Sequence, residues 1–309
     1  MATTGSDHPR HAGTVLDHVA HAVPRWQDVW HRYAGDLGAV WASGGPGPGF
    51  APGQLRFANG ACVEVLMPSN TEVNDFLARF LSRSGPGPHH LTFKVPDLAA
   101  ALDRVRRAGF EPINIDMSHP EWMEAFLHPK AAGGVVVQLA EAPHPWSSPP
   151  PDDYPTDLRL RADGSGPTAP ATLERVCHVV ADLTGARRLF GDVLAGEEVA
   201  QGTADGLTWV DLRWGGPLGL RLVGATDPTR GDPVDEWLGG LPGRVHHLAF
   251  ETEEPGSVPD ARPATGRLEM LGAAPASDGL WVVDAQANGG LALVLGGFGG
   301  ASGVPSGDR

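Results

Sequence analysis

The feature that most constrains this chain is an internal repeat. The segment "LDHVAHAV" (16–23) opens the first half and "LERVCHVV" (173–180) opens the second, each followed by a helical pattern and several short strand patterns. Later, "ACVEVLMPS" (61–69) is matched by "LGLRLVGAT" (218–226). Repetition of several segments in the same order predicts copies of one supersecondary unit rather than a chance likeness.

The spacing inside the repeat is the same in both halves. His18 precedes His90 by 72 residues, and Arg175 precedes His247 by 72 residues. A strand, a helix and further strands recur twice in each half. We therefore expect an α+β fold of four strand-helix-strands modules, arranged as two pairs in two domains.

Composition divides the chain into segments. Residues 14–141 and residues 172–296 are expected to form two domains of the same type. Between them, residues 142–171 are rich in Pro, Ser, Gly and Asp, which predicts an extended linker. The glycine-rich residues 297–309 are predicted to be a disordered tail.

Charge and cysteine content exclude several classes of function. The net charge of −14 leaves no basic stripe for nucleic-acid phosphates. No apolar run approaches the length of a membrane span, and the N-terminus has no apolar signal region. The two cysteines, Cys62 and Cys177, lack the spacing of a disulfide framework or a structural zinc site. These features predict a cytoplasmic protein that binds neither nucleic acid nor membrane.

Four ligand-type side chains occupy equivalent positions of the first half. Because side chains alternate along a strand, His18 and His90 are expected to face one cleft, with Glu64 and Gln138 at the matching positions of each module's last strand. Two imidazoles, one carboxylate and one amide oxygen suit a divalent ion of Mn, Fe, Co, Ni or Zn. The alternative is four half-buried polar residues without a ligand, but ligand types at all four positions favour a metal.

The second half lacks this set. Its equivalent residues are Arg175, Arg221, His247 and Val294, and guanidinium groups do not bind metals. We expect the arginines to form structural ion pairs rather than an anion site.

These motifs resemble the vicinal-oxygen-chelate superfamily, which includes glyoxalase I, methylmalonyl-CoA epimerase, extradiol dioxygenases and the fosfomycin and bleomycin resistance proteins. The resembling pieces are "LDHVAHAV", "CVEVLMP", "HHLTFKVPDLAAALDRVRRAGFEP" and "HPKAAGGVVVQLAE". They cover most of residues 14–141, and residues 172–296 resemble a second domain of this type. The resemblance implies paired βαβββ modules that form an open sheet around a metal held by His18, Glu64, His90 and Gln138.

The resemblance also implies a reaction. Epimerases and glyoxalase I usually carry Glu where this chain has Gln138, and Gln cannot act as a base. Glu64 is then the only carboxylate of the set, which makes it the expected catalytic proton shuttle for an epimerase-like or glyoxalase-like isomerase or lyase. The expected partner is a small carbonyl compound, with an acyl-CoA thioester as one class.

Two other functions remain open. Two histidines and one glutamate also match the ligands of Fe(II) dioxygenases, although the extradiol carboxylate resembles position 138 rather than Glu64. A protein that sequesters a small molecule without turnover would equally explain the diverged second half. The sequence leaves the oligomeric state and the identity of the metal undecided.

Overall fold

The protein is described by a computed structural model over residues 13–152, 154, 170–227, 233–270 and 279–296. Sixteen strands in these ranges form two eight-stranded sheets. The predicted tail, 297–309, lies outside the described residues. No helix within the described ranges is long and apolar enough to cross a membrane.

The first sheet has the strand order β2-β3-β4-β1-β5-β8-β7-β6. Its strands are β1 (Val15–Ala22), β2 (Val40–Gly44), β3 (Gly49–Arg56), β4 (Cys62–Ser69), β5 (Gly87–Lys94), β6 (Pro112–Asp116), β7 (Met123–Leu127) and β8 (Val136–Glu141). Strand β5 pairs with β8 in parallel, while β2-β3-β4 and β6-β7-β8 are antiparallel. Two modules of the first half therefore share one sheet, as the repeat predicts.

The second sheet repeats this topology, in the order β10-β11-β12-β9-β13-β16-β15-β14. Its strands are β9 (Thr172–Val180), β10 (Glu197–Ala204), β11 (Leu207–Arg213), β12 (Gly219–Ala225), β13 (Gly243–Glu251), β14 (Ala261–Pro263), β15 (Trp281–Val283) and β16 (Ala292–Gly296). Adding eight to each strand number of the first sheet gives the second. The expected class of tandem βαβββ modules is thereby confirmed.

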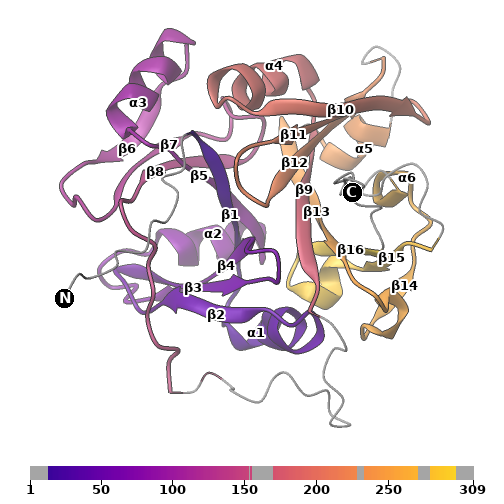
Figure 1. The fold of residues 1–309 in the computed structure, drawn as a ribbon, viewed down its shortest axis with the longest axis horizontal. Coiled ribbons are helices and arrows are strands. Elements are labelled where there is room, and N and C mark those ends of the chain that lie inside the picture. Colours follow the sequence, from indigo (N-terminus) through magenta and orange to yellow (C-terminus); the bar gives the residue numbers. More distant parts are fainter. Residues whose placement is uncertain (1–12, 153, 155–169, 228–232, 271–278, 297–309) are drawn as a thin grey trace, which may run out of the picture. The chain divides into compact units, whose positions relative to one another are not determined.

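The helices are short and differ between modules (Figure 1). They are α1 (Gln27–Trp30), α2 (Phe76–Ser84), α3 (Leu98–Arg107), α4 (Leu183–Arg187), α5 (Pro233–Leu238) and α6 (Arg267–Met270). Two of them continue as π-helices, α1 over His31–Asp36 and α4 over Arg188–Val193. Short 3-10 turns cover Pro255–Ser257 and Ala285–Asn288.

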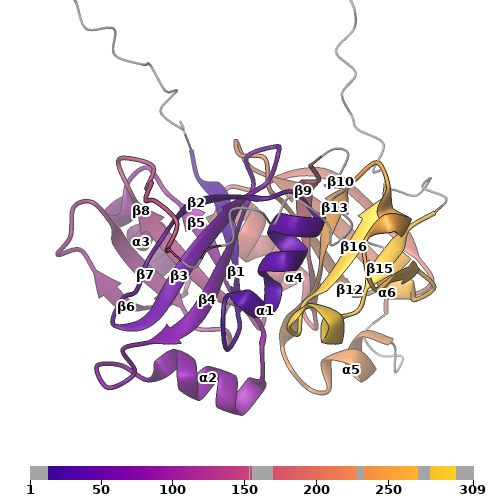
Figure 2. The ribbon, with the colours of Figure 1, turned by 90° about the horizontal axis from the view of Figure 1, so that it is seen from below.

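The sequence of helix α3 explains where the helix begins and which of its faces is buried. The Asp97 side chain accepts a hydrogen bond from the Ala100 amide and caps the helix N-terminus. Its buried residues, Leu98, Ala101, Leu102 and Val105, follow the three-to-four spacing of one helix face, and that face contacts β6 and β8. Helix α2 similarly contacts β3 and β4, beside which Figure 2 shows it.

Two compact units are distinguished by packing, and each combines modules of both halves. The first comprises the described residues of Met1–Ala20, His89–Trp146 and His178–Arg244, and the second those of His21–Pro88, Ser147–Cys177 and Val245–Arg309. In the first unit, Phe93 packs against Phe190 and Trp214, with ring centroids 5.9 and 5.1 Å apart. In the second, Phe57 packs on Phe250 at 4.9 Å. The packing units thus differ from the predicted domains 14–141 and 172–296, which stay a prediction.

A buried histidine in each unit binds the loop before a final strand. His21 Nε2 lies 2.7 Å from the Gly289 carbonyl oxygen, and His178 Nε2 lies 2.8 Å from that of Gly133. Burial lowers the pKa of both histidines to about 4, against the opposing effect of these backbone contacts. Both histidines are therefore neutral at pH 7 and donate Nε2–H to the loop carbonyl. A Cβ on Gly289 would come within 2.9 Å of Val29, so this close approach requires glycine.

Candidate metal centre

His18, Glu64 and His90 form a cluster whose ligand atoms all lie within 4.8 Å of one another. The residues come from β1, β4 and β5, which are neighbours in the order of the first sheet. Their exposed fractions are 0%, 9% and 6%. Two imidazoles and a carboxylate gathered at this spacing fit a first-row divalent ion, because these are the ligand types such ions take.

The orientation of His18 is fixed by its neighbour in sequence. His18 Nδ1 donates to Asp17 Oδ2 at 2.8 Å, and Asp17 Oδ1 accepts an ion-pair contact from Lys94 Nζ at 3.0 Å. Burial by itself would raise the pKa of Asp17, but the hydrogen bond with His18 and the charges of His18 and Lys94 hold this pKa well below its usual range. Asp17 is thus ionised, and Nε2 is the nitrogen of His18 that a metal would take.

His90 is held in a similar way by the other member of the His-His pair. His89 Nδ1 and His90 Nδ1 lie 2.8 Å apart, which directs Nε2 of His90 away from this contact. The rings of His18 and His90 meet edge to face, with centroids 5.8 Å apart. His90 is the more buried member of its pair, as expected for the ligand position.

Glu64 faces the adjacent strand. Gln54 lies directly opposite it in the β3–β4 register and donates Nε2–H to Glu64 Oε1 at 3.5 Å. Ser43 in turn donates to Gln54 Oε1 at 3.3 Å. These neutral partners orient the carboxylate without adding a charge that would compete for it.

Gln138 is connected to His18 through Thr92. The Thr92 hydroxyl donates to Gln138 Oε1 at 2.5 Å and lies 2.8 Å from His18 Nε2. Thr92 and Gln138 are direct partners in the parallel β5–β8 register. On its other side, Gln138 Nε2 donates to Glu124 Oε2 at 2.6 Å, and Trp122 Nε1 donates to the same oxygen at 2.8 Å. The structure brings all four predicted residues onto adjacent strands, and their assignment as ligands stays a prediction.

The second sheet has different chemistry at these positions. Arg221 is only 2% exposed, and its Nε and Nη2 donate to the two carboxylate oxygens of Asp211 at 2.6 Å each. The guanidinium also lies 4.3 Å from the ring centre of Trp209. The expected structural ion pair is therefore confirmed for Arg221. Arg175 is buried as well, and its predicted pairing stays a prediction.

Sequence reasoning missed the residues that support the ligands. Thr92 shares the strand face of His90, so alternation could have identified it, whereas alternation places Asp17 on the opposite face from His18 and only its adjacency in sequence pointed to it. Gln54 and Glu124 carried no such signal, because only the strand register places them opposite Glu64 and beside Gln138.

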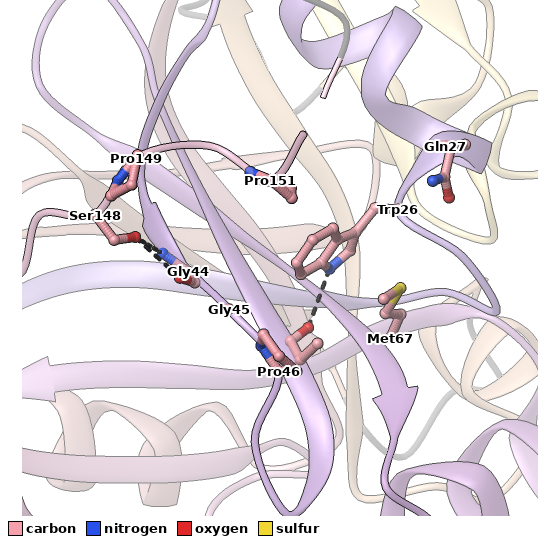
Figure 3. A pocket seen from close by; sticks show the side chains of 10 residues that line it. Trp26, Gln27, Gly44, Gly45, Pro46, Met67, Ser148, Pro149 and Pro151 are labelled. Atoms are coloured by element: carbon pink, nitrogen blue, oxygen red, sulfur yellow. Dashed lines mark hydrogen bonds between the residues drawn. The ribbon is translucent and has the colours of Figure 1, made fainter. Parts of the chain in front are cut away.

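A separate cavity of about 430 Å³ lies in the second unit (Figure 3). Its lining residues are Trp26, Gln27, Gly44, Gly45, Pro46, Ala51, Met67, Ser148, Pro149 and Pro151. Ala51 and Met67 alternate with Gln54 and Glu64 along β3 and β4, so the cavity lies on the opposite sheet face from Glu64. These lining residues include no titratable side chain, so the wall offers no group for acid–base chemistry. In its wall, Ser148 exchanges hydrogen bonds with the Gly44 backbone at 2.9 Å.

Comparisons with known proteins agree with this architecture. Residues 17–126 match the family described as the Glyoxalase/Bleomycin resistance protein/Dioxygenase superfamily. The ethylmalonyl-CoA/methylmalonyl-CoA epimerase of Cereibacter sphaeroides is 30% identical over 139 residues, which cover 41% of this chain and 96% of that protein. The mitochondrial methylmalonyl-CoA epimerase of Mus musculus is 30% identical over 134 residues, covering 41% of this chain and 72% of the relative.

A solved structure extends the likeness of fold to nearly the whole chain. A mutant of 4-hydroxymandelate synthase from Streptomyces coelicolor superposes with a TM-score of 0.62 and covers 92% of each chain at 17% sequence identity. At this identity the likeness concerns the fold alone. It accounts for both eight-stranded sheets, whereas the epimerases match less than half of the chain.

Proposed function

Because the chain belongs to the glyoxalase/bleomycin resistance protein/dioxygenase superfamily, we propose that it is a metal-dependent isomerase or lyase that removes a proton from the carbon next to a carbonyl. The observation that carries this proposal is the buried group of His18, Glu64 and His90, with ligand atoms within 4.8 Å of one another. On this proposal residues 14–141 carry the reaction, and residues 172–296 are a diverged domain without a metal.

The proposed ligands are Nε2 of His18 and of His90, a carboxylate oxygen of Glu64 and Oε1 of Gln138. The ion would be Co, Mn, Ni, Zn or Fe. When bound, such an ion supplies Lewis-acid stabilisation of negative charge on a substrate oxygen. The hydrogen bonds of Asp17 and His89 to the other ring nitrogens keep the two imidazoles in the orientation that this role needs.

Glu64 is the proposed proton acceptor. The C–H bond next to the carbonyl breaks, the proton passes to the Glu64 carboxylate, and the electron pair moves onto the carbonyl oxygen. Return of the proton to the other face of that carbon would give an epimer. The neutral contact with Gln54 suits this task, since a cation at that position would hold Glu64 ionised and weaken it as a base.

The proposed substrate is a small carbonyl compound with adjacent oxygens, and we favour an acyl-CoA thioester. Two relatives, each matching 41% of this chain, are named for their action on methylmalonyl-CoA. A thioester carbonyl acidifies the neighbouring C–H bond, so this substrate class fits a single carboxylate base.

The test is solvent-deuterium exchange into methylmalonyl-CoA, followed by mass spectrometry with metal added back. Glu64→Gln should reduce the exchange rate by a factor on the order of 100 or more, while the protein retains part of its metal. The exposed Glu251→Gln is the matched control and should exchange at the rate of the unaltered protein. Equal exchange by Glu64→Gln and the unaltered protein would contradict the role of Glu64.

A second candidate is an Fe(II)-dependent dioxygenase. The observation in its favour is the composition of the cluster, since His18, His90 and Glu64 are the two histidines and one carboxylate of a facial triad. Oxygen uptake that requires ferrous iron and a catechol would support this function. Deuterium exchange without oxygen consumption would support the isomerase or lyase instead.

A further inference from the structure

We infer that Glu124 is a positioning residue for the proposed metal centre, because it holds the Gln138 amide with its oxygen turned toward Thr92 and His18. This role rests on the proposed function, in which Gln138 Oε1 is a ligand. Glu124 lies on β7, next to the strand β8 that carries Gln138. The two side chains share the sheet face of His18, as their hydrogen bonds show.

The contacts of Gln138 allow one orientation of its amide. Glu124 Oε2 already accepts the Trp122 indole N–H at 2.8 Å, so the group of Gln138 that faces this oxygen at 2.6 Å is its NH2. Its oxygen then faces the Thr92 hydroxyl, which donates to it at 2.5 Å. A flipped amide would bring two oxygens together at Glu124 and present a nitrogen, which is no metal ligand, to Thr92.

These contacts belong to a continuous series of polar contacts in the first unit. It runs from Trp122 through Glu124, Gln138, Thr92, His18 and Asp17 to Lys94. The ammonium of Lys94 lies 5.8 Å from the ring centre of Trp122, where the series begins. Glu124 Oε2 therefore accepts two hydrogen bonds, one from the Trp122 indole and one from the Gln138 amide.

The second sheet shows that the fold does not require this series of polar contacts. In the register, Thr92 and Gln138 correspond to Ala249 and Val294, which are likewise direct partners across a parallel strand pair. Phe126 pairs with Gln138, and Val282 pairs with Val294. Glu124 lies two residues before Phe126, so its counterpart is Leu280, two residues before Val282.

Ala249, Leu280 and Val294 belong to one buried apolar cluster. The same backbone thus accepts apolar packing where the first sheet has a threonine, a glutamine and a glutamate. Packing alone gives no reason for the polar set, since buried polar groups stabilise a fold less than apolar ones unless they are fully hydrogen-bonded. A requirement for one amide orientation does give a reason.

The first experiment tests the orientation of the Gln138 amide in the absence of metal. In the 15N–1H spectrum of the metal-free protein, the side-chain NH2 signals of Gln138 are those lost in Gln138→Ala. Glu124→Leu copies the residue of the second sheet and should shift these signals and speed their exchange with water. Glu124→Gln keeps an acceptor oxygen and should restore the signals of the unaltered protein. Unchanged Gln138 signals in Glu124→Leu would overturn the inference.

The second experiment measures the Co2+ dissociation constant by calorimetry. Glu124→Leu should weaken binding by about tenfold, as expected for a residue that orients a ligand, and Glu124→Gln should weaken it less. The exposed Glu121→Leu is the matched control and should bind as the unaltered protein does. In a Gln138→Ala background, Glu124→Leu should have no further effect, because Glu124 acts through Gln138.

The outcomes separate this inference from the proposed function. Full Co2+ affinity in Glu124→Leu, or an equal loss with and without Gln138, would overturn the positioning role while the metal centre stands. Failure of the unaltered protein to bind Co2+ would remove the metal centre, and with it the positioning role, even if the NH2 signals respond to Glu124→Leu.

Discussion

The two sheets have the same topology and opposite chemistry at the same positions. In the first, Glu64 faces the uncharged Gln54, and in the second, Arg221 faces the acidic Asp211 across the same strand register. The polar Thr92, Gln138 and Glu124 of the first sheet are replaced by Ala249, Val294 and Leu280. The His-His pair is common to both, with Nδ1 atoms 2.8 and 2.7 Å apart.

The difference separates what builds the fold from what builds the site. In the second sheet, the buried guanidinium of Arg221 is paired with the Asp211 carboxylate through two hydrogen bonds. The first sheet instead gathers imidazole and carboxylate groups within 4.8 Å, an arrangement that a divalent cation would stabilise. A His-His pair is therefore not diagnostic by itself, and its partners on neighbouring strands determine its use.

The largest effect should appear when equivalent histidines are replaced. His90→Ala should lower metal affinity by about 100-fold or more, because it removes one of the two proposed imidazole ligands. His247→Ala, its counterpart in the second sheet, should leave the metal content unchanged. Metal analysis by mass spectrometry of both variants, purified without chelator, checks this. Equal metal content in His90→Ala and the unaltered protein would contradict the proposed site.

An intermediate effect is expected at the ion pair of the second sheet. Arg221→Met should lower the free energy of unfolding by about 3 kcal/mol, because it leaves the largely buried Asp211 carboxylate without its partner. Replacing both, with Asp211→Leu added, should recover most of this loss. Urea unfolding measures the change, and metal content should not respond. Loss of metal in Arg221→Met would contradict the view that the metal centre depends on the first sheet alone.

The smallest effect concerns a feature that both halves share. The pKa of His21 and of His178 is about 4 in the folded protein, below the ordinary 6.5 of an unfolded chain. Each therefore contributes stability that is fully present above pH 6.5 and is lost as the pH falls toward 4, by about 2 kcal/mol each at pH 5.

The glutamine variants of these two histidines test this equivalence. His21→Gln and His178→Gln keep a side-chain N–H donor for the loop carbonyl but do not titrate. Each should reduce, by a similar amount, the stability difference between pH 7.5 and pH 5 in urea unfolding. A pH dependence that is unchanged in both variants would show that neither histidine is protonated on unfolding.

Much of this architecture could be predicted from the sequence. The 72-residue spacing and the strand alternation predicted four modules, and they placed His18, Glu64, His90 and Gln138 at equivalent positions of four strands, which the structure shows to be adjacent. The expected pairing of Arg221 was also confirmed, because a buried guanidinium requires a carboxylate. These predictions succeeded because they depend on local periodicity and on the repeat, which a single chain displays directly.

The sequence by itself determined the four modules, their order and the ligand-type residues of the first half. Only the tertiary structure decided which side chains hold those residues, since Gln54 and Glu124 meet Glu64 and Gln138 through strand registers that local patterns leave open. It also decided which modules pack together, as in the contact of Phe93 with Phe190. The physical reason is that alternation shows which face of a strand is apolar, whereas the partner that covers this face is selected by long-range packing.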